Sequence, residues 1–519
     1  MSTPAVSPAH VVADQEPVFA LLADPATHGL ADTVSRIDTH GAAVFLAGHD
    51  VYKVKRAVRF PFMDLSTLDK RHAACARELE VNRATAPGLY LDLVPIRRDG
   101  AGLRLGGDKG TIVEWAVHMR RFDEHATLDR LPADALTPAL IDALARAVHA
   151  AHERAPRHVE VDSAGELAKV ASGIVAGLRE SPDIFAPPRV AALATAFTDR
   201  LARLSPRLDR RARAGEVRRG HGDLHLRNIA LINGAPVLFD ALEFDEALAT
   251  TDRLYDLAFL LMDLGQRGLT LPANRLLNRY LAAGGDAPPY DGLAALPLFL
   301  ALRAGIRAQV TAAALALRDG PAKRAAEAEA LAYLGHAETA LAPRPARLVA
   351  VGGLSGTGKS TLATRLAPAI GPLPGAVHLR SDVERKRLAG VGELDRLPPD
   401  AYTREVTEAV YATLRERARA VLAAGHGVIV DAVHQRDDER AAIEDVAREA
   451  GAAFTGLWLE APLDTLTARV EGRRGDASDA TAAVMAQQAA RDCGSVRWHR
   501  LSTAGGKEAT LVEARRLLP

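Results

Sequence analysis

The chain has little cysteine, few aromatic residues and no net charge, and each shortage argues against a class of protein. Its two cysteines, Cys75 and Cys493, lie far apart in the sequence and cannot by themselves form a disulfide framework or a zinc motif. Aromatic residues make up 4% of the chain, and 65 basic residues balance 65 acidic ones. We therefore expect neither a long groove that stacks nucleic-acid bases nor a global field that attracts polyanions.

Long hydrophobic runs are absent as well. No apolar stretch approaches the roughly 18 residues that a membrane-spanning helix needs. The N-terminal segment MSTPAVSPAHVVADQEPVF lacks the basic start and apolar centre of a secretory signal. We therefore expect a cytoplasmic protein without membrane contact.

The chain is nevertheless long and apolar enough for more than one core. It has 519 residues, of which 48% are hydrophobic, so we expect two or three domains. Pro343 and Pro345 end an alanine-rich helical stretch, and a strand-like run, RLVAVGG, follows at once. We predict a tail with a short helix over residues 1–34, a domain over 35–342, a linker over 343–346 and a second domain over 347–519.

The two predicted domains differ in their patterns. After the linker, five strand-like runs alternate with helical segments, which predicts a parallel sheet flanked by helices. Before it, strand-like runs occupy the first third, and residues 134–335 are mostly helical apart from HGDLHLRNIALINGAPVLFDALEF at 221–244. The pair Asn233-Gly234 in this segment predicts a hairpin turn. The expected fold class is multidomain, combining α/β and α+β parts.

The segment GLSGTGKS at 353–360 matches the phosphate-binding loop G-x-x-x-x-G-K-[ST], and it lies between a predicted strand and a predicted helix. Its backbone N–H groups would surround the phosphates of a nucleotide, Lys359 would reach the β and γ phosphates, and Ser360 would hold Mg²⁺. The predicted nucleotide-binding residues here are Gly353, Ser355, Gly356, Thr357, Gly358, Lys359, Ser360 and Thr361, with Lys359 also catalytic.

Polar residues that follow this loop suit a kinase. Asp382 ends the next strand and could accept the proton of an incoming hydroxyl, or simply cap a helix. Arg385, one turn later, could hold an anionic group of the acceptor. Asp431, at the end of VIVDA, lies where an acid would approach Mg²⁺. Arg469 and Arg473 are predicted lid arginines that contact the transferred phosphoryl group, although a solvated helix face is the alternative.

The segment HGDLHLRN at 221–228 is a second candidate for phosphate chemistry. Phosphoryl transfer needs a carboxylate that orients the acceptor hydroxyl and oxygen ligands that hold Mg²⁺ on the nucleotide. Asp223 supplies a candidate base, Asn228 a candidate metal ligand, and Asp240 in LFD a second ligand. Glu243, close behind Asp240, could bind a cationic acceptor or belong to a solvated acidic loop.

Both motif sets resemble known families. Residues 346–519 resemble P-loop kinases of small molecules and polynucleotide 5′-ends, such as gluconate kinase, chloramphenicol phosphotransferase, zeta toxin and polynucleotide kinase, a group of AAA-type ATPase domains. Residues 35–335 resemble the aminoglycoside phosphotransferase and choline kinase branch of the protein-kinase-like fold, which has HGD where protein kinases have HRD.

The second resemblance implies a two-lobed fold and further site residues. Lys53 in DVYKV is similar to the lysine that holds the α and β phosphates, with Lys55 as the competing choice. Glu78, or Glu80, would be the helix acid that pairs with this lysine. The chain departs from protein kinases in lacking the G-x-G-x-x-G loop, and the insertion RFPFMDLSTLDK between Lys53 and Glu78 could alter or block the cleft.

Together these motifs predict an ATP- and Mg²⁺-dependent kinase, with GTP as an alternative donor. A bifunctional phosphotransferase acting on hydroxyls of a sugar, an amino sugar or an aminoglycoside-like molecule is the first hypothesis. The alternatives are a single P-loop kinase regulated by a non-catalytic kinase-like domain, and a polynucleotide 5′-hydroxyl kinase or repair protein. A nucleic-acid partner is not favoured by the balanced charge. The sequence identifies neither the acceptor nor the oligomeric state.

Overall fold

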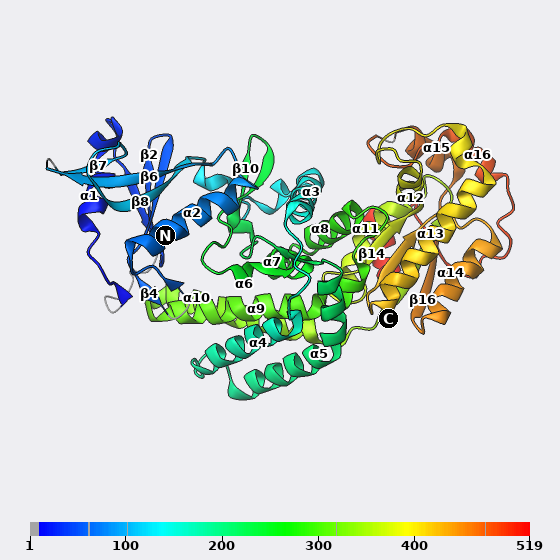
Figure 1. Ribbon diagram of the computed structural model, residues 1–519. Helices are drawn as coiled ribbons and strands as arrows, with labels where there is room; N and C mark the ends of the chain where they lie inside the picture. Colours follow the sequence, from blue (N-terminus) through cyan, green and yellow to red (C-terminus); the bar gives the residue numbers. More distant parts are fainter. Residues whose placement is uncertain (1–9, 61–62, 101, 318, 473, 519) are drawn as a thin grey trace. The chain divides into compact units, whose positions relative to one another are not determined.

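The computed structural model describes residues 10–60, 63–100, 102–317, 319–472 and 474–518. Backbone packing divides the chain into two compact units, and each unit combines two separate segments of the chain (Figure 1). Unit 1 contains Met1–Asp263 and Leu302–Ala337, and unit 2 contains Leu264–Ala301 and Glu338–Pro519. Among the described residues, no helix is both long and apolar enough to cross a membrane.

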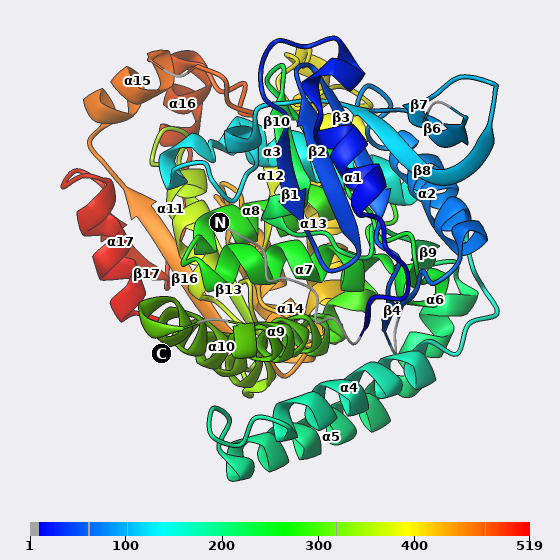
Figure 2. The ribbon, with the colours of Figure 1, turned by 90° about the vertical axis from the view of Figure 1, so that its left-hand side faces the viewer.

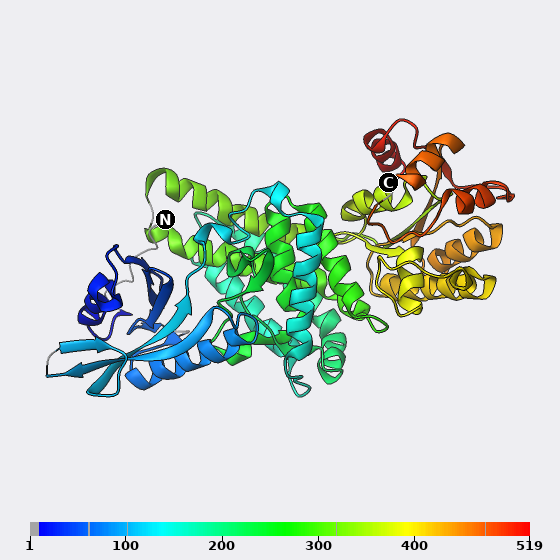
Figure 3. The same cartoon turned by 90° about the horizontal axis from the view of Figure 1, so that it is seen from above.

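Unit 1 begins with an antiparallel six-stranded sheet in the order β1-β2-β3-β8-β6-β7. Figure 3 shows the strands of this sheet in shades of blue. Gly48 and His49 form the turn between β2 and β3. The bounds are β1 Ser35–Asp38, β2 Ala42–Ala47, β3 Asp50–Lys55, β6 Tyr90–Asp99, β7 Gly102–Leu105 and β8 Thr111–Arg120.

Two helices cover opposite faces of this sheet. Phe19 of α1 (Glu16–Ala23) shares a buried cluster with Val54 of β3, whereas Cys75 of α2 (Leu68–Arg83) shares one with Val51. Because successive side chains of a strand point to opposite faces, Lys53 and Lys55 lie on the face of Val51, toward α2. The strand period therefore directs both lysines to the helix that carries Glu78.

The insertion between Lys53 and Glu78 folds on its own small core. It contains the short strands β4 (Arg59–Phe60) and β5 (Met63–Asp64), which pair antiparallel. Val58 and Leu65 are buried there, and the partly buried side chains of Phe60 and Met63 pack against them.

The rest of unit 1 is mainly helical. Helices α4 (Ser163–Arg179) and α5 (Pro187–Arg213) lie side by side (Figure 2). The predicted hairpin is β10 (Ile229–Ile232) and β11 (Ala235–Leu238), and both turn residues, Asn233 and Gly234, have positive φ, as a type I′ turn requires. The remaining elements are α3 Pro138–Arg154, β9 Val217–Arg219, α6 Glu246–Ala249, β12 Thr250–Asp252, α7 Arg253–Gln266, α9 Leu296–Ala313 and α10 Gly320–Leu341, of which α7, α9 and α10 include residues of both units.

Unit 2 is built on a parallel five-stranded sheet in the order β14-β15-β13-β16-β17. All five strand-like runs of the sequence form strands: β13 Arg347–Gly353, β14 Val377–Arg380, β15 Val428–Asp431, β16 Ala453–Glu460 and β17 His499–Ser502. β13 is buried along almost its whole length, as expected for a central strand covered on both faces. The helices of this unit are α8 Thr270–Ala283, α11 Lys359–Leu366, α12 Ser381–Leu388, α13 Arg404–Ala423, α14 Asp437–Glu449, α15 Leu463–Glu471, α16 Ala482–Ala489 and α17 Lys507–Arg516. The predicted multidomain α/β and α+β fold class is confirmed.

Candidate active sites

Two lysines of β3 share one carboxylate in unit 1. Lys53 Nζ lies 2.7 Å from Glu78 Oε1 and 2.7 Å from Asp240 Oδ1. Lys55 Nζ lies 2.6 Å from Glu78 Oε2 and 2.5 Å from Glu243 Oε1. Of the two acids considered on α2, the structure thus places Glu78 beside the lysines, whereas Glu80 pairs with Arg77 at 2.7 Å.

The cluster is ionised in spite of its burial. Burial lowers the pKa of Lys53, but the neighbouring Asp240 and Glu78 more than compensate and hold this pKa well above its usual value. Burial would raise the pKa of Glu78, yet Lys53 and Lys55 hold it below its usual range. Glu243, predicted to bind a cationic acceptor, has its charge paired with Lys55, so an acceptor amine would have to compete with this lysine.

The backbone around Asp240 is held from two other elements. Asp240 has φ of 59°, in the left-handed region that aspartate tolerates better than most residues. Its N–H donates to Tyr90 Oη at 3.1 Å, and the N–H of Ala241 donates to Asn82 Oδ1 at 2.8 Å. The sequence interpretation missed both partners, although Asn82 lies four residues after Glu78 and so on the same face of α2.

The segment at 221–228 is anchored to α7 through Asp256. The backbone N–H groups of His221 and Gly222 donate to the Asp256 carboxylate at 2.9 and 2.8 Å, and His152 Nε2 lies 3.0 Å from it. Gly222 has φ of 80°, and a Cβ there would lie 2.8 Å from the Cβ of Leu242. This turn therefore requires glycine.

Asp223 and Asn228 meet within the same loop. Asn228 Nδ2 donates to the backbone oxygen and to Oδ2 of Asp223, both at 3.0 Å, and His225 Nε2 lies 3.4 Å from Oδ2. Burial would raise the pKa of Asp223, but His225 holds it well below its usual value. The candidate base is therefore a carboxylate that can accept a proton.

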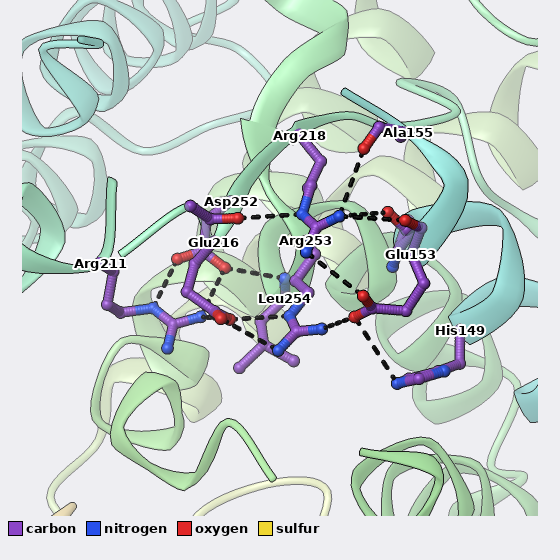
Figure 4. Close-up of polar contacts among 11 residues, drawn as sticks. His149, Glu153, Ala155, Arg211, Glu216, Arg218, Asp252, Arg253 and Leu254 are labelled. Carbon is purple, nitrogen blue, oxygen red and sulfur yellow. Dashed lines mark hydrogen bonds and ion pairs between the residues drawn. The ribbon is translucent and has the colours of Figure 1, made fainter. Parts of the chain in front are cut away.

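A network of ion pairs fixes the strands and helices that lead into this loop (Figure 4). Arg211 of α5 is fully buried and pairs at 2.6 Å with Asp252, the residue that precedes α7. Arg253, the first residue of α7, lies 2.7 Å from Glu216 and 2.5 Å from Glu153 of α3. β9 leads into the 221–228 loop, and α7 carries Asp256, which binds the backbone of this loop. The ion pairs therefore fix both the strand before the loop and the helix that holds it.

His149 and His152 have a spacing that can also serve a metal, but their contacts give them other roles. His149 Nε2 lies 3.9 Å from Glu153, and His152 pairs with Asp256. The two imidazoles therefore belong to the scaffold under the loop.

In unit 2, the predicted phosphate loop connects β13 to α11. Gly353, Gly356 and Gly358 all have positive φ. A Cβ on Gly353 would lie 2.5 Å from the Leu459 oxygen, and one on Gly356 would lie 2.8 Å from the Leu466 oxygen. The glycines therefore satisfy both the turn and the close approach of neighbouring backbone.

The loop borders a cavity of about 1510 Å³. Residues Ser355 to Thr361 line it, together with Asp382, Arg385 and Arg469. Lys359 Nζ donates to the Leu354 oxygen at 3.0 Å. The structure thus gathers most of the predicted residues of this half around one space, whereas Arg473 lies outside the described residues.

Two acids near the loop have opposite electrostatic environments. Burial raises the pKa of Asp382 above its usual value, and the negative charge of Asp431 raises it further. Burial also acts to raise the pKa of Asp431, but its contact with His378 and the charge of Arg380 lower it to about 2. Asp431 is thus the fixed anion of the pair, and Asp382 the group more ready to take a proton.

The two described arginines of the predicted site both donate to neutral groups. Arg385 is 7% exposed, and its guanidinium donates to the Ala401 oxygen at 2.8 Å and to Thr407 Oγ1 at 3.2 Å, both neutral groups. Arg469 donates to Thr503 Oγ1 at 2.9 Å and to the Thr503 oxygen at 2.8 Å.

A segment that precedes α16 also lines the cavity. Asp476 lies 3.1 Å from Arg380, and Asp479 lies 2.9 Å from Lys386 and 2.7 Å from the hydroxyl of Tyr402. The sequence interpretation placed a lid here but did not identify these anchors, which join residues about 80–100 positions apart.

The donor set in each unit fits Mg²⁺. In the part of the chain that the structure describes, no group of three or more His, Cys, Asp and Glu side chains is arranged to hold a metal ion. Mg²⁺ bound to a nucleotide needs only one or two protein ligands beside phosphate oxygens and water. Asn228 and Asp240 in unit 1, and Ser360 and Asp431 in unit 2, offer such oxygen ligands.

Each half of the chain matches a known protein family. The model described as "Phosphotransferase enzyme family" matches residues 47–296, and the one described as "AAA domain" matches residues 348–492. The uncharacterized protein Rv2004c of Mycobacterium tuberculosis is 32% identical over 493 residues, which cover 92% of this chain and 94% of that protein. The chain belongs to the same family as this protein. Its two domains are kinase-like, which indicates phosphotransfer to a small molecule as the class of activity.

More distant similarities concern one half each. An adenylyl-sulfate kinase of Myxococcus xanthus is 35% identical over 118 residues, which cover 22% of this chain and 59% of that protein. The structure of a choline/ethanolamine kinase family protein from Mesorhizobium loti is 15% identical, with a TM-score of 0.37, over 63% of this chain and 95% of that one. A gluconokinase structure from Sinorhizobium meliloti is 21% identical, with a TM-score of 0.24, over 33% of this chain and 94% of that one.

Proposed function

We propose that the chain is a bifunctional ATP- and Mg²⁺-dependent phosphotransferase, in which each half transfers the γ-phosphoryl group of ATP to a hydroxyl of a small molecule such as a sugar or an amino sugar. The observation that carries this proposal is the assembled lysine cluster of unit 1. Lys53 lies 2.7 Å from both Glu78 and Asp240. Catalysis by kinase-like sites requires a lysine–glutamate ion pair and an aspartate for Mg²⁺, and the cluster contains both kinds of group.

In unit 1, Asp223 takes the part of the base. Its low pKa keeps it ionised, so it can orient the acceptor hydroxyl and receive its proton as the new O–P bond forms. Lys53 contacts the α and β phosphates, and Asn228 and Asp240 hold Mg²⁺. Mg²⁺ held there would neutralise negative charge on the nucleotide phosphates.

In unit 2, Lys359 and N–H groups of the loop residues that line the cavity hold the phosphates, whereas the N–H of Gly353 donates to the Val433 oxygen at 3.1 Å. Asp382 receives the proton of the acceptor hydroxyl, and Ser360 and Asp431 hold Mg²⁺. Arg385 binds an anionic group of the acceptor, because its present hydrogen-bond partners are neutral and leave its charge available to a ligand. Arg469, which lines the same cavity, contacts the nucleotide.

The test is ATP consumption with Mg²⁺ by the wild type, Asp223→Ala and Lys359→Ala over a panel of sugars, amino sugars, aminoglycosides, nucleosides and 5′-hydroxyl oligonucleotides. We expect each variant to lose a different acceptor-dependent activity. Full activity of both variants on every acceptor would refute the proposal. If Lys359→Ala lost all turnover and Asp223→Ala none, unit 1 would instead be a nucleotide-binding module that regulates unit 2.

A further inference from the structure

The edge of the unit 2 sheet is covered by a helix from far upstream in the chain. Helix α8 lies within the range matched by the phosphotransferase family model, residues 47–296, yet it packs in unit 2 beside β14. β14 is the first strand in the sheet order, with β15 as its strand neighbour. The contact therefore joins residues about 100 positions apart in the sequence.

Two asparagines of α8 replace a missing strand partner. Asn274 Nδ2 and Asn278 Nδ2 donate to the Ala376 oxygen at 3.0 and 3.2 Å. Asn278 Oδ1 in turn accepts the N–H of His378 at 2.7 Å. Asn274 is 3% exposed and Asn278 is partly buried, and a buried polar group left unpaired there would cost roughly 1–3 kcal/mol.

β14 carries the side chains that surround the acids of the P-loop site. His378 Nε2 lies 3.4 Å from Asp431 Oδ2, and Arg380 Nε lies 3.6 Å from the same oxygen. Asp382 follows two residues after the last residue of the strand. Asn278 is thus separated from Asp431 by a single residue, His378, whose backbone it binds and whose imidazole contacts the acid.

Further contacts attach the same segment along this side of unit 2. Arg279 of α8 pairs with Glu393 at 2.5 Å, and Arg417 of α13 donates to the Gly285 oxygen at 2.7 Å. Asp286 forms an ion pair with Arg387 of α12. The attachment is therefore distributed over α8 and the turn that follows it.

We propose that α8 is a positioning element of the P-loop site, with Asn278 as its central positioning residue. Asn278 holds β14 in register, so that His378 and Arg380 meet Asp431, and Asp382 faces the phosphate loop. The inference rests on the proposed function of unit 2 and adds that its site is completed by a segment of the phosphotransferase half.

The test uses the full-length protein with Asn278→Ala, and Leu271→Ala, an exposed residue of the same helix, as the matched control. The readouts are Lys359-dependent ATP turnover and the Mg²⁺ concentration that gives half-maximal binding of a fluorescent ATP analogue. We expect Asn278→Ala to lower turnover and raise the Mg²⁺ midpoint by about 10-fold or more, as for other residues that orient metal ligands. Asn278→Asp keeps an acceptor for the His378 N–H and should therefore lose less turnover than Asn278→Ala. Leu271→Ala should have wild-type turnover and Mg²⁺ midpoint, and the Asp223-dependent activity should be unchanged in all variants.

The outcomes separate the two proposals. A wild type without Lys359-dependent turnover or nucleotide binding would refute both the proposed function of unit 2 and this inference. A normal wild type and an Asn278→Ala protein with the same Mg²⁺ midpoint and turnover per folded molecule would overturn the inference alone, even if its melting temperature fell. If the alanine variant does not fold, the replacement is Asn278→Leu, which keeps a branched side chain but removes both hydrogen-bonding groups, and wild-type values of the Mg²⁺ midpoint and turnover in that protein would also overturn the inference.

Discussion

Lys53 and Lys55 of β3 both pair with Glu78, but each has a different second carboxylate partner. Lys53 connects this acid to Asp240, a candidate metal ligand, whereas Lys55 connects it to Glu243. We expect Lys53→Ala to lower Asp223-dependent turnover by about 100-fold, the effect of removing one charge-stabilising donor from an active site. Steady-state kinetics of the full-length protein with an acceptor from the panel would measure it.

Lys55→Ala is the matched control for this substitution. The substitution leaves Glu243 without its partner in a buried pair, so the free energy of unfolding of unit 1, measured with urea, should fall by about 3–5 kcal/mol. Turnover of the folded protein should fall less than it does in Lys53→Ala. The reverse order of the two turnover losses would show that Lys55 is the lysine that contacts phosphate.

The two candidate bases should lose activity at different pH. A base works only when deprotonated, so its activity is lost as the pH falls through its pKa. The pKa of Asp223 lies below the usual value for aspartate, about 3.9, and that of Asp382 lies above its usual value. As the pH is lowered, Lys359-dependent turnover should therefore fall before Asp223-dependent turnover. pH profiles of Asp223→Ala and Lys359→Ala isolate the two activities, and coincident acid limbs would contradict this assignment.

At the scale of elements, local signals predicted most of the fold. The five strands of unit 2 were visible as apolar runs between helical segments, and the Asn233-Gly234 turn was visible as a dipeptide that tolerates positive φ. The phosphate loop was visible because its glycines, lysine and serine are contiguous. In each case the information lies within about ten residues of sequence.

Contacts between distant elements left no such signal. Lys55 meets Glu243 across 188 positions, and His378 meets Asn278 across 100. No sequence pattern shows that a single asparagine on a helix binds the edge of a sheet. Two lysines on the same face of a strand are equally good candidates for phosphate contact until the position of the loop with Asp240 and Glu243 is known. The insertion after Lys53 illustrates the same limit, because its paired strands and small core depend on which side chains pack against Val58 and Leu65.

At the scale of the whole molecule, the compact units do not coincide with contiguous halves of the chain. Unit 2 includes residues 264–301 as well as those after the two prolines. A fragment of residues 343–519 should therefore lack the cover of β14, with the Ala376 oxygen and the His378 N–H at an open sheet edge. Open edges are sites of strand pairing between molecules. The fragment should consequently be less stable and prone to self-association.

We expect this fragment to lose about 2 kcal/mol of stability, which corresponds to a melting temperature lower by roughly 4–8 °C for a domain of its size. The comparison is with a fragment of residues 264–519, which retains α8, by thermal unfolding with and without Mg-ATP and by size-exclusion chromatography at two protein concentrations. The shorter fragment should also form concentration-dependent oligomers. Equal melting temperatures and equal nucleotide stabilisation of the two fragments would mean that the second unit folds without α8. In that case, the asparagines would be a contact that forms after folding and adds nothing to the stability of the sheet.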